Sequence, residues 1–337
     1  MRLKGRSREA SMRILGTLVT GLSLLLWPAL ATAQNKAEDF PARSIRLIVP
    51  FPPGGPNDII ARIVGQRMSE LTKQPVVIEN RAGQAGVLGT DAVAKASPDG
   101  YTIGIVNASA LAINPTMEKV PYDVAKDFAP VTPVATVPEM LVVAGNVPAR
   151  NMAELVALAK ANPGKFNFAS AGVGGLPHLA GELFKQIADI DIVHVPYRGA
   201  APAINDLLGR QVQMAFLDLP VLLPHIKAGT IFPIAIGARE RAPTAPDGPT
   251  TAEVGMPGLL IENWYGMIAP AKTPPAIVAA LNRITNEATA DASVRQKFAE
   301  QGLAAASDTP EHFREFIGAE TRKWAKVLKD AGIPTGQ

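Results

Sequence analysis

The sequence contains no cysteine, and histidine and aromatic residues are scarce. Without cysteine the chain forms neither disulfide bonds nor thiolate metal sites, so packing alone must stabilise the fold. The four histidines lack the paired spacing of a zinc site, and the sequence has no H-E-x-x-H motif and no G-x-S-x-G turn. A scattered Ser-His-Asp arrangement stays open, because it leaves no local pattern. We therefore expect no metal, no cofactor and no enzymatic activity.

Only one stretch resembles a membrane-directed segment, and it lies at the N-terminus. Residues 14–30 are mostly apolar, follow a basic region and precede the small-x-small sequence Ala31-Thr32-Ala33. This order is typical of a cleaved signal peptide. We predict that residues 1–33 are removed and that the protein is exported to the periplasm. An uncleaved N-terminal anchor is the alternative.

The positive charge of the sequence belongs largely to this leader. The whole chain has 33 Lys and Arg residues against 30 Asp and Glu residues. The leader holds five of the basic residues and one of the acidic residues, which leaves 28 against 29 in residues 34–337. That remainder has no basic stripe interleaved with aromatic residues. It is therefore not expected to bind nucleic acid.

Beyond residue 40, short β-branched runs alternate with amphipathic helical stretches. Residues 45–49 read as a strand, for example, and apolar residues at helical spacing follow over 59–71. This alternation predicts an α/β fold with mainly parallel sheets flanked by helices. Further helices are expected over 276–290 and 310–329, near the C-terminus.

The expected mature chain is longer than one hydrophobic core usually supports, so two lobes are predicted. Residues 34–137 form the first part of lobe 1, residues 138–254 form lobe 2, and residues 255–337 return to lobe 1. The segments 122–138 and 242–258 are rich in proline and are predicted to link the lobes.

Two glycine-rich turns occupy the places where α/β proteins bind ligands, between the carboxyl end of a strand and the next helix. They cover residues 50–58 and 167–178 and match neither a Walker loop nor a dinucleotide fingerprint. Free N–H groups and the helix dipole at such helix starts favour a carboxylate or a phosphate. Asp58 is expected to stabilise its helix start. A tight turn without a ligand is the other interpretation of the first segment.

Side chains near these turns are further candidates. Ser170 offers a hydroxyl donor, and His178 either faces the cleft or is held by structural hydrogen bonds. Tyr197 and Arg198 follow the next strand, although Arg198 is as well explained by a role in holding its own loop. Asp218 is a weaker candidate of the same type.

Several segments in this order resemble the solute receptors of tripartite tricarboxylate transporters, the Bug family. They run from Ile48-Val49-Pro50-Phe51-Pro52-Pro53-Gly54-Gly55 through Pro98-Asp99-Gly100-Tyr101-Thr102 and Val195-Pro196-Tyr197-Arg198-Gly199-Ala200 to Asn263-Trp264-Tyr265-Gly266. The resemblance covers essentially the whole mature chain. It implies a two-lobed "Venus flytrap" that binds carboxylated solutes through backbone N–H groups and bridging waters.

The resemblance also implies a set of ligand-binding residues in the two turns. These are Phe51, Pro53, Gly54, Gly55, Asn57, Asp58, Ser170, Ala171, Gly172, Gly174, Gly175 and His178. The family commonly has Ser or Thr where this chain has Gly175, and a hydroxyl residue is frequent where it has Asn57. We expect the lost hydroxyl at Gly175 to alter ligand preference without abolishing binding, because one neutral hydrogen bond contributes only about 0.5–1.5 kcal/mol.

The predicted function is therefore a periplasmic receptor, expected to be a monomer. It would close on an amino acid, a di- or tricarboxylate or an aromatic acid and deliver it to the permease subunits of such a transporter. A sensor of the same fold that feeds a signalling system is the first alternative, and a periplasmic hydrolase is a more remote one.

Overall fold

Short β-branched runs and the helices after them build the first half of the sheet. The computed structural model describes residues 40–330, and all elements below belong to the unit that begins at Arg43. Three parallel strands lie in the order β2-β1-β3: β1 (Ile45–Val49), β2 (Val76–Asn80) and β3 (Thr102–Asn107). Helices α3 (Pro56–Thr72) and α4 (Val87–Ala94) connect them, as the apolar spacing predicts.

One long strand, β4 (Phe128–Ala144), joins the two halves of the sheet. Its first part, as far as Pro138, pairs antiparallel with β9 (Glu262–Pro270), and from Glu139 onward it pairs with other strands. Much of the segment predicted as a linker over 122–138 is therefore strand. Two of its prolines lie beside register shifts, where a residue without an N–H group is tolerated, and its role as a link between lobes stays a prediction.

The second half of the sheet repeats the strand-turn-helix pattern. Strands β5 (Phe166–Ser170), β6 (Ile192–Pro196) and β7 (Met214–Asp218) are parallel, whereas β4 runs antiparallel to β7 and to β8 (Ile231–Ile236). The helices here are α6 (Met152–Ala161), α7 (Leu176–Ala188), α8 (Ala200–Leu208) and α9 (Leu219–Lys227). The predicted α/β class is confirmed, and the sheet is mixed because β4 and β9 oppose their neighbours.

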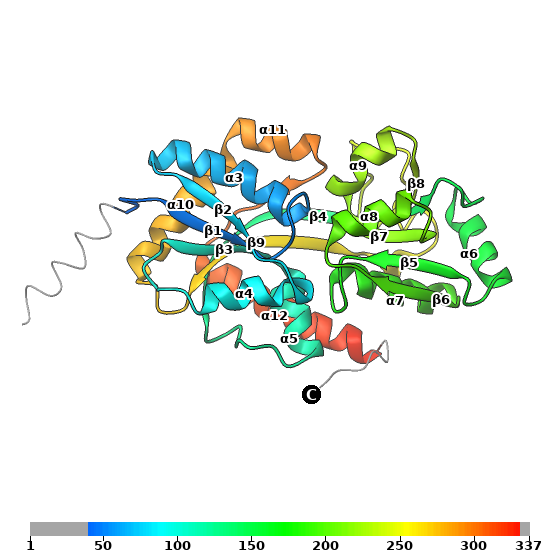
Figure 1. Ribbon diagram of the computed structural model, residues 1–337, viewed down its shortest axis with the longest axis horizontal. Coiled ribbons are helices and arrows are strands. Elements are labelled where there is room, and N and C mark those ends of the chain that lie inside the picture. The colour runs from blue at the N-terminus through cyan, green and yellow to red at the C-terminus, as the bar shows by residue number, and fades with distance from the viewer. Residues whose placement is uncertain (1–39, 331–337) are drawn as a thin grey trace, which may run out of the picture. The chain divides into compact units, whose positions relative to one another are not determined.

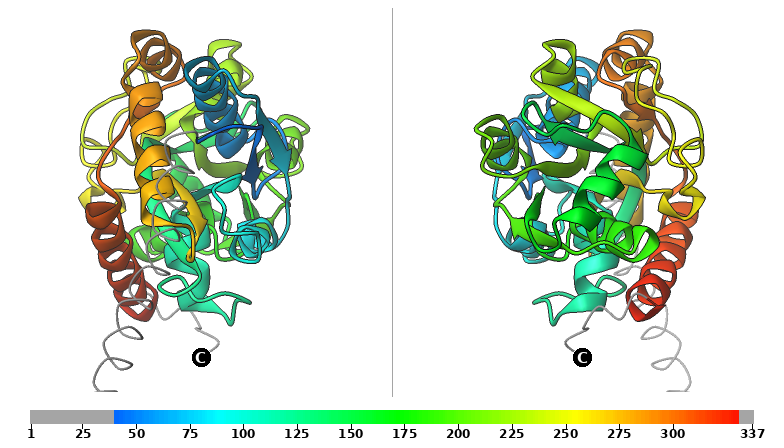
Figure 2. Two further views of the ribbon diagram at one scale, coloured as in Figure 1. Left: turned by 90° about the vertical axis from the view of Figure 1, so that its left-hand side faces the viewer. Right: turned by 90° about the vertical axis from the view of Figure 1, so that its right-hand side faces the viewer.

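Helices cover both faces of the first half-sheet, with α3 on one side and α4 and α12 on the other (Figure 1). The C-terminal helices are α10 (Pro275–Ala290), α11 (Ala292–Glu300) and α12 (Pro310–Asp330). Of these, α10 and α12 match the predicted ranges closely and lie along one side of the molecule (Figure 2). Both pack on β4, although more than 130 residues separate them from it in the chain.

A buried carboxylate anchors α12 to the sheet. Glu320 accepts hydrogen bonds from the indole N–H groups of Trp264 (3.2 Å) and Trp324 (3.1 Å). Shorter elements complete the fold: η1 (Gln84–Gly86), η2 (Ser109–Ile113), α5 (Asn114–Met117), η3 (Pro257–Leu259) and β10 (Ala304–Ala305). The second predicted linker, 242–258, consists mostly of turns. No helix among residues 40–330 is long and apolar enough to span a membrane, and the predicted leader lies outside those residues.

Candidate functional site

A small cavity lies where the carboxyl ends of β1, β3, β5 and β7 come together. Its volume is about 30 Å³. Its lining comes from both halves of the sheet and from the starts of α3, α7 and α8. The lining residues are Phe51, Pro52, Gly55, Pro56, Asn57, Ala85, Asn107, Ser109, Ala171, Gly175, Pro177, Ala200, Ala201, Asp218, Asn263 and Tyr265.

The two glycine-rich turns predicted from the sequence meet at this cavity. Of the predicted residues, those in the lining are Phe51, Gly55, Asn57, Ala171, Gly175 and Asp218. Those outside the lining are Pro53, Gly54, Asp58, Ser170, Gly172, Gly174, His178, Tyr197 and Arg198. The weaker candidate Asp218 is thus a wall of the cavity, whereas the side chain of Arg198 is exposed to solvent.

The first turn is held by Asp58 and leaves a helix start uncapped. The Asp58 carboxylate accepts hydrogen bonds from the Gly54 N–H (3.0 Å), Arg62 Nε (2.8 Å) and Asn80 Nδ2 (3.0 Å). Burial raises the pKa of Asp58, but these hydrogen bonds outweigh burial and lower it below its ordinary value. Gly55 is the N-cap residue of α3 and Pro56 follows it, with no side-chain cap among the described residues. Pro56 has no N–H group and the Asp58 N–H donates to the Gly55 carbonyl at 3.0 Å, so the Asn57 N–H is the first-turn group of α3 that lacks an acceptor among the described residues.

The second turn differs, because protein acceptors already occupy several of its N–H groups. The Leu176 N–H, at the start of α7, donates to Ser109 Oγ at 3.0 Å. The Gly174 N–H donates to His178 Nδ1 (3.3 Å) and the Gly175 N–H to the Gly172 carbonyl (3.2 Å). In this conformation the Leu176 N–H at the start of α7 is bonded within the protein, whereas the Asn57 N–H at the start of α3 has no acceptor among the described residues.

Ser170 and the two nearby histidines form a buried support behind the second turn. Ser170 Oγ lies 2.6 Å from His194 Nε2, and the His194 ring stacks on that of His178 with ring centres 4.0 Å apart. Burial, followed by the charge of His178, lowers the pKa of His194 to about 3. Ser170 is fully buried, so this pair presents no accessible nucleophile. The structural interpretation of His178 is the one that the contacts favour.

Four further polar residues of the lining were not among the predicted residues, namely Asn107, Ser109, Asn263 and Tyr265, although a signal existed for the first two. Asn107 and Ser109 follow the carboxyl end of β3, the same position that marked the other turns. Asn263 lies at the start of β9, which is antiparallel to β3 and β4, so the rule for parallel strands does not find it. Tyr197, in contrast, turns to Asp206, to which its hydroxyl donates at 2.7 Å.

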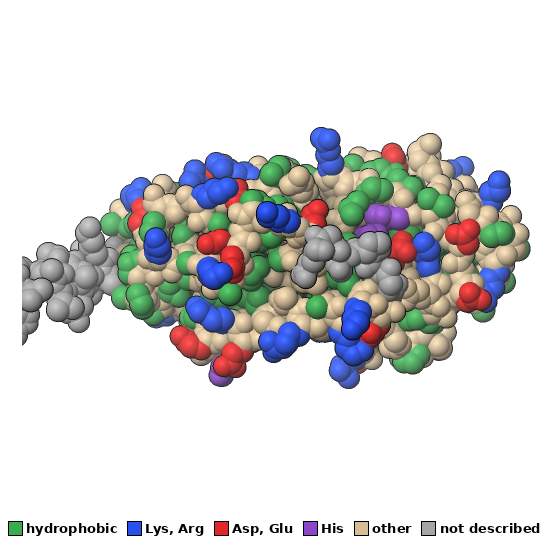
Figure 3. Space-filling model, turned by 90° about the horizontal axis from the view of Figure 1, so that it is seen from below, with side chains coloured by type: hydrophobic (Ala, Val, Ile, Leu, Met, Phe, Trp, Pro, Cys, Tyr) green, Lys and Arg blue, Asp and Glu red, His purple; other side chains and the backbone are tan. Residues whose placement is uncertain are grey.

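The lining contains no Lys, Arg or His, and Asp218 is its one carboxylate. The outer surface differs, since basic and acidic side chains are interspersed over the face shown in Figure 3. A ligand in the cavity would therefore meet hydrogen-bonding groups and a single acidic side chain.

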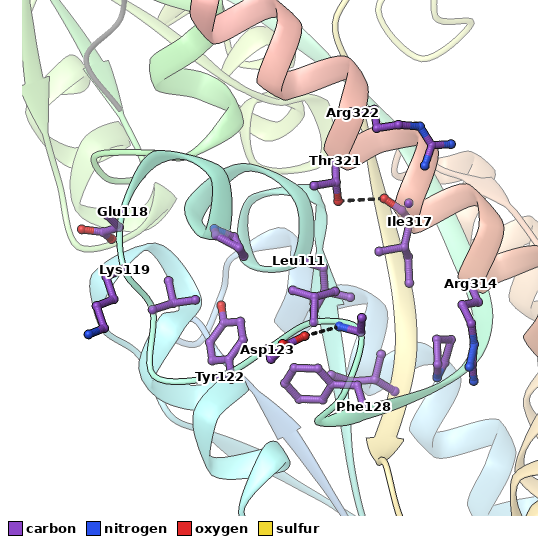
Figure 4. A pocket seen from close by; sticks show the side chains of 17 residues that line it. Leu111, Glu118, Lys119, Tyr122, Asp123, Phe128, Arg314, Ile317, Thr321 and Arg322 are labelled. Atoms are coloured by element: carbon purple, nitrogen blue, oxygen red, sulfur yellow. Dashed lines mark hydrogen bonds between the residues drawn. The ribbon is translucent and has the colours of Figure 1, made fainter. Parts of the chain in front are cut away.

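A larger cavity of about 850 Å³ lies away from both glycine-rich turns. It is bounded by α12 and by the chain around Tyr122, and its wall is largely apolar (Figure 4). Arg314 and Arg322 extend from α12 at its rim. None of the predicted ligand-binding residues lines this cavity, so the predicted site is the small one.

Comparisons with known proteins identify the family. Residues 60–333 match the family model "Tripartite tricarboxylate transporter family receptor". The chain belongs to this receptor family. Protein BugT of Bordetella pertussis is 38% identical over 94% of this chain and 97% of its own length.

Solved structures of similar proteins agree with this assignment. The chain is similar to R. palustris Rpa4515 with adipate, at 35% identity and a TM-score of 0.85 over 88% of this chain and 99% of that one. It is also similar to MatC from Rhodopseudomonas palustris with bound malate, at 31% identity and a TM-score of 0.80 over 86% and 100%. The receptor family and its two-lobed binding-protein fold are thus confirmed.

Proposed function

We propose that this receptor binds a small carboxylated compound in a cleft between two lobes in the periplasm and delivers it to the permease of a tripartite tricarboxylate transporter. The observation that supports this proposal most directly is the meeting of the starts of α3 and α7 at one cavity. Helix starts offer N–H groups and a partial positive charge, which suit a carboxylate. Two similar proteins are described with adipate and with malate, which are both dicarboxylates.

The exchange of partners along β4 supports the proposed lobes. Up to Pro138 this strand pairs with β9, and from Glu139 it pairs with β7. The proposed boundaries, at 34–137, 138–254 and 255–337, place β1 to β3 and β9 in lobe 1 and β5 to β8 in lobe 2. The cavity then has walls from both lobes.

Binding in this cleft requires the lobes to move apart. A cavity of about 30 Å³ holds little more than a water molecule, far less than a dicarboxylate. The Leu176 N–H and Ser109 Oγ also bond across it. A hinge motion that opens and closes the cleft is therefore part of the proposed mechanism.

Ligand-induced stabilisation tests the proposal. Protein purified from the periplasm is heated with amino acids, di- and tricarboxylates and aromatic acids. A ligand at 100 times its Kd should stabilise the fold by about 2.7 kcal/mol, which raises the Tm measurably. Receptor function would be refuted if no carboxylate raised the Tm while the protein hydrolysed an ester or amide.

A matched pair of variants locates the site. Ala171→Phe places a ring at the cavity wall and should abolish the Tm shift. Val173→Phe places the same ring two residues further on, at a side chain that is 59% exposed, and should leave the shift unchanged. Equal shifts in both variants would show that the ligand binds elsewhere. Uptake of the ligand by a deletion strain then separates a transport role from a sensor role, because only transport requires the receptor for uptake.

A further inference from the structure

The wall of the cavity at β7 and β9 is rich in hydrogen-bond acceptors. Tyr265 Oη donates to Asp218 Oδ2 at 2.7 Å, and Asn263 Nδ2 donates to Asp218 Oδ1 at 3.2 Å and to Tyr265 Oη at 3.0 Å. These bonds fix the orientation of the Asn263 amide, because the reverse orientation would set its oxygen against the carboxylate. Asn263 Oδ1 is buried and has no partner among the described residues.

A second carboxyl group, that of Glu139, lies behind this wall. Glu139 on β4 stands directly opposite Asp218 on β7 in the strand pairing. Glu139 is 1% exposed, and neither of its carboxyl oxygens has a hydrogen-bond partner among residues 40–330. Burial, and then the neighbouring Asp218, raises the pKa of Glu139 well above its ordinary value.

Asp218 is the member of the pair whose carboxylate accepts hydrogen bonds. Burial raises its pKa to about 7, although the hydrogen bonds from Tyr265 and Asn263 oppose that rise. Asp218 accepts these hydrogen bonds and Glu139 does not, and hydrogen bonds to a carboxylate stabilise its charged form. The side of the cavity at Asp218 and Asn263 therefore has acceptors in excess of donors.

Another part of the lining, at the start of α3, offers a donor. α3 begins at Gly55 without a side-chain cap, Pro56 has no N–H group and the Asp58 N–H donates to the Gly55 carbonyl, so the Asn57 N–H is the first-turn donor without an acceptor among the described residues. The described lining has no basic side chain that could neutralise both ends of a dicarboxylate. A molecule that is acidic at both ends would meet a donor at α3 and a like charge at Asp218.

We propose that the ligand carries an ammonium or hydroxyl group beside its carboxylate, and that Asp218, with Asn263 Oδ1, accepts hydrogen bonds from that group. The carboxylate then faces the start of α3. This inference rests on the proposed function and narrows it from carboxylates in general to amino and hydroxy acids. Asp218 is the residue that sets this preference.

Sets of acids matched in length test the inference on the unaltered protein. Calorimetric titration at pH 7.5 compares succinate with malate and aspartate, glutarate with 2-hydroxyglutarate and glutamate, and adipate with 2-aminoadipate. A hydrogen bond to a charged group corresponds to about a 10- to 100-fold change in Kd. At the chain length that binds best, the amino or hydroxy acid should bind tighter by that factor.

Asp218→Asn assigns the preference to this residue. The variant should lose most of the preference for the amino acid over the plain dicarboxylate. Asp206→Asn is the matched control, since Asp206 also accepts a tyrosine hydroxyl at 2.7 Å but lies outside the lining, and it should keep the preference.

The possible outcomes separate this inference from the proposed function. Plain dicarboxylates that bind the unaltered protein as tightly as their amino and hydroxy counterparts would overturn the inference and leave the receptor function standing. A preference that survives in Asp218→Asn would overturn the role of Asp218. Failure of every carboxylate, in this set and in the broader panel, would refute the proposed function itself.

Discussion

Asp218→Asn should also make the unliganded protein more stable at alkaline pH. Burial raises the pKa of Asp218 to about 7, against an ordinary value of 3.8, so the folded state holds this proton more tightly than the unfolded state. Stability from this group is therefore full at low pH and is lost as the pH rises from about 4 to about 7. The complete loss is on the order of 4 kcal/mol. Asparagine does not ionise, so the variant does not lose this stability as the pH rises.

The substitution keeps one of the two hydrogen bonds at this position. An asparagine at 218 keeps an oxygen for the Tyr265 hydroxyl, whereas its NH2 group replaces the oxygen that accepts from Asn263 Nδ2, so the Asn263 amide has to turn over. Glu139 is also the acidic group that faces Asp218 across the strand pair, and burial and then Asp218 raise its pKa well above the ordinary value. The difference in pH dependence between the variant and the unaltered protein therefore reports on Asp218 together with its interaction with Glu139.

Urea denaturation followed by tryptophan fluorescence measures the effect, since Trp264 and Trp324 are both buried. At each pH, the free energy of unfolding of the unaltered protein is subtracted from that of Asp218→Asn. This difference should be about 3 kcal/mol larger at pH 8 than at pH 5. Asp206→Asn provides the control, with an equal effect expected at both pH values. A gain from Asp218→Asn that did not change with pH would refute the reasoning.

Three further predictions concern packing and buried hydrogen bonds, each measured by urea denaturation. Gly181→Ala should destabilise the fold by about 1–3 kcal/mol, because the added methyl group would lie 2.0 Å from Phe168 Cε2; a more stable variant would contradict this. Gly318→Ala, also within a helix, should stabilise by about 0.5–1 kcal/mol, since its new methyl group meets only the end of a flexible arginine. Glu320→Ala should cost about 1–3 kcal/mol, because both indole N–H groups that donate to it lose their acceptor, whereas Glu320→Gln should recover part of this loss.

The sequence was sufficient to predict the parts of the site that depend on local chain geometry. Paired glycines after a β-branched run and a proline at the helix start specify a strand-turn-helix unit within about ten residues. Both turns, and Asp58 as a support for the first, are where this pattern predicts them. The ligand-binding role of the predicted residues stays a prediction.

Contacts between distant segments could not be predicted in this way. The hydroxyl of Ser109 satisfies the Leu176 N–H from 67 positions away, and no spacing in the sequence indicates which helix start receives such a group. The pairing of Asp218 with Glu139 depends on the register between β4 and β7. That register is set by the packing of the whole sheet, which a pattern in a single sequence does not specify.

The arrangement of β4 has a consequence for how the chain acquires its fold. Strands β7, β8, β9 and β10, with which β4 pairs, all follow it, and the last of them begins at Ala304. The central strand therefore stays incompletely paired until nearly the whole chain has been made. Such long-range pairing slows folding, because the chain loses entropy on closing a long loop before the stabilising strand contacts form. A newly made chain would thus remain unfolded for longer, which would favour the export that the N-terminal leader predicts, since a chain passes through a narrow channel before it folds.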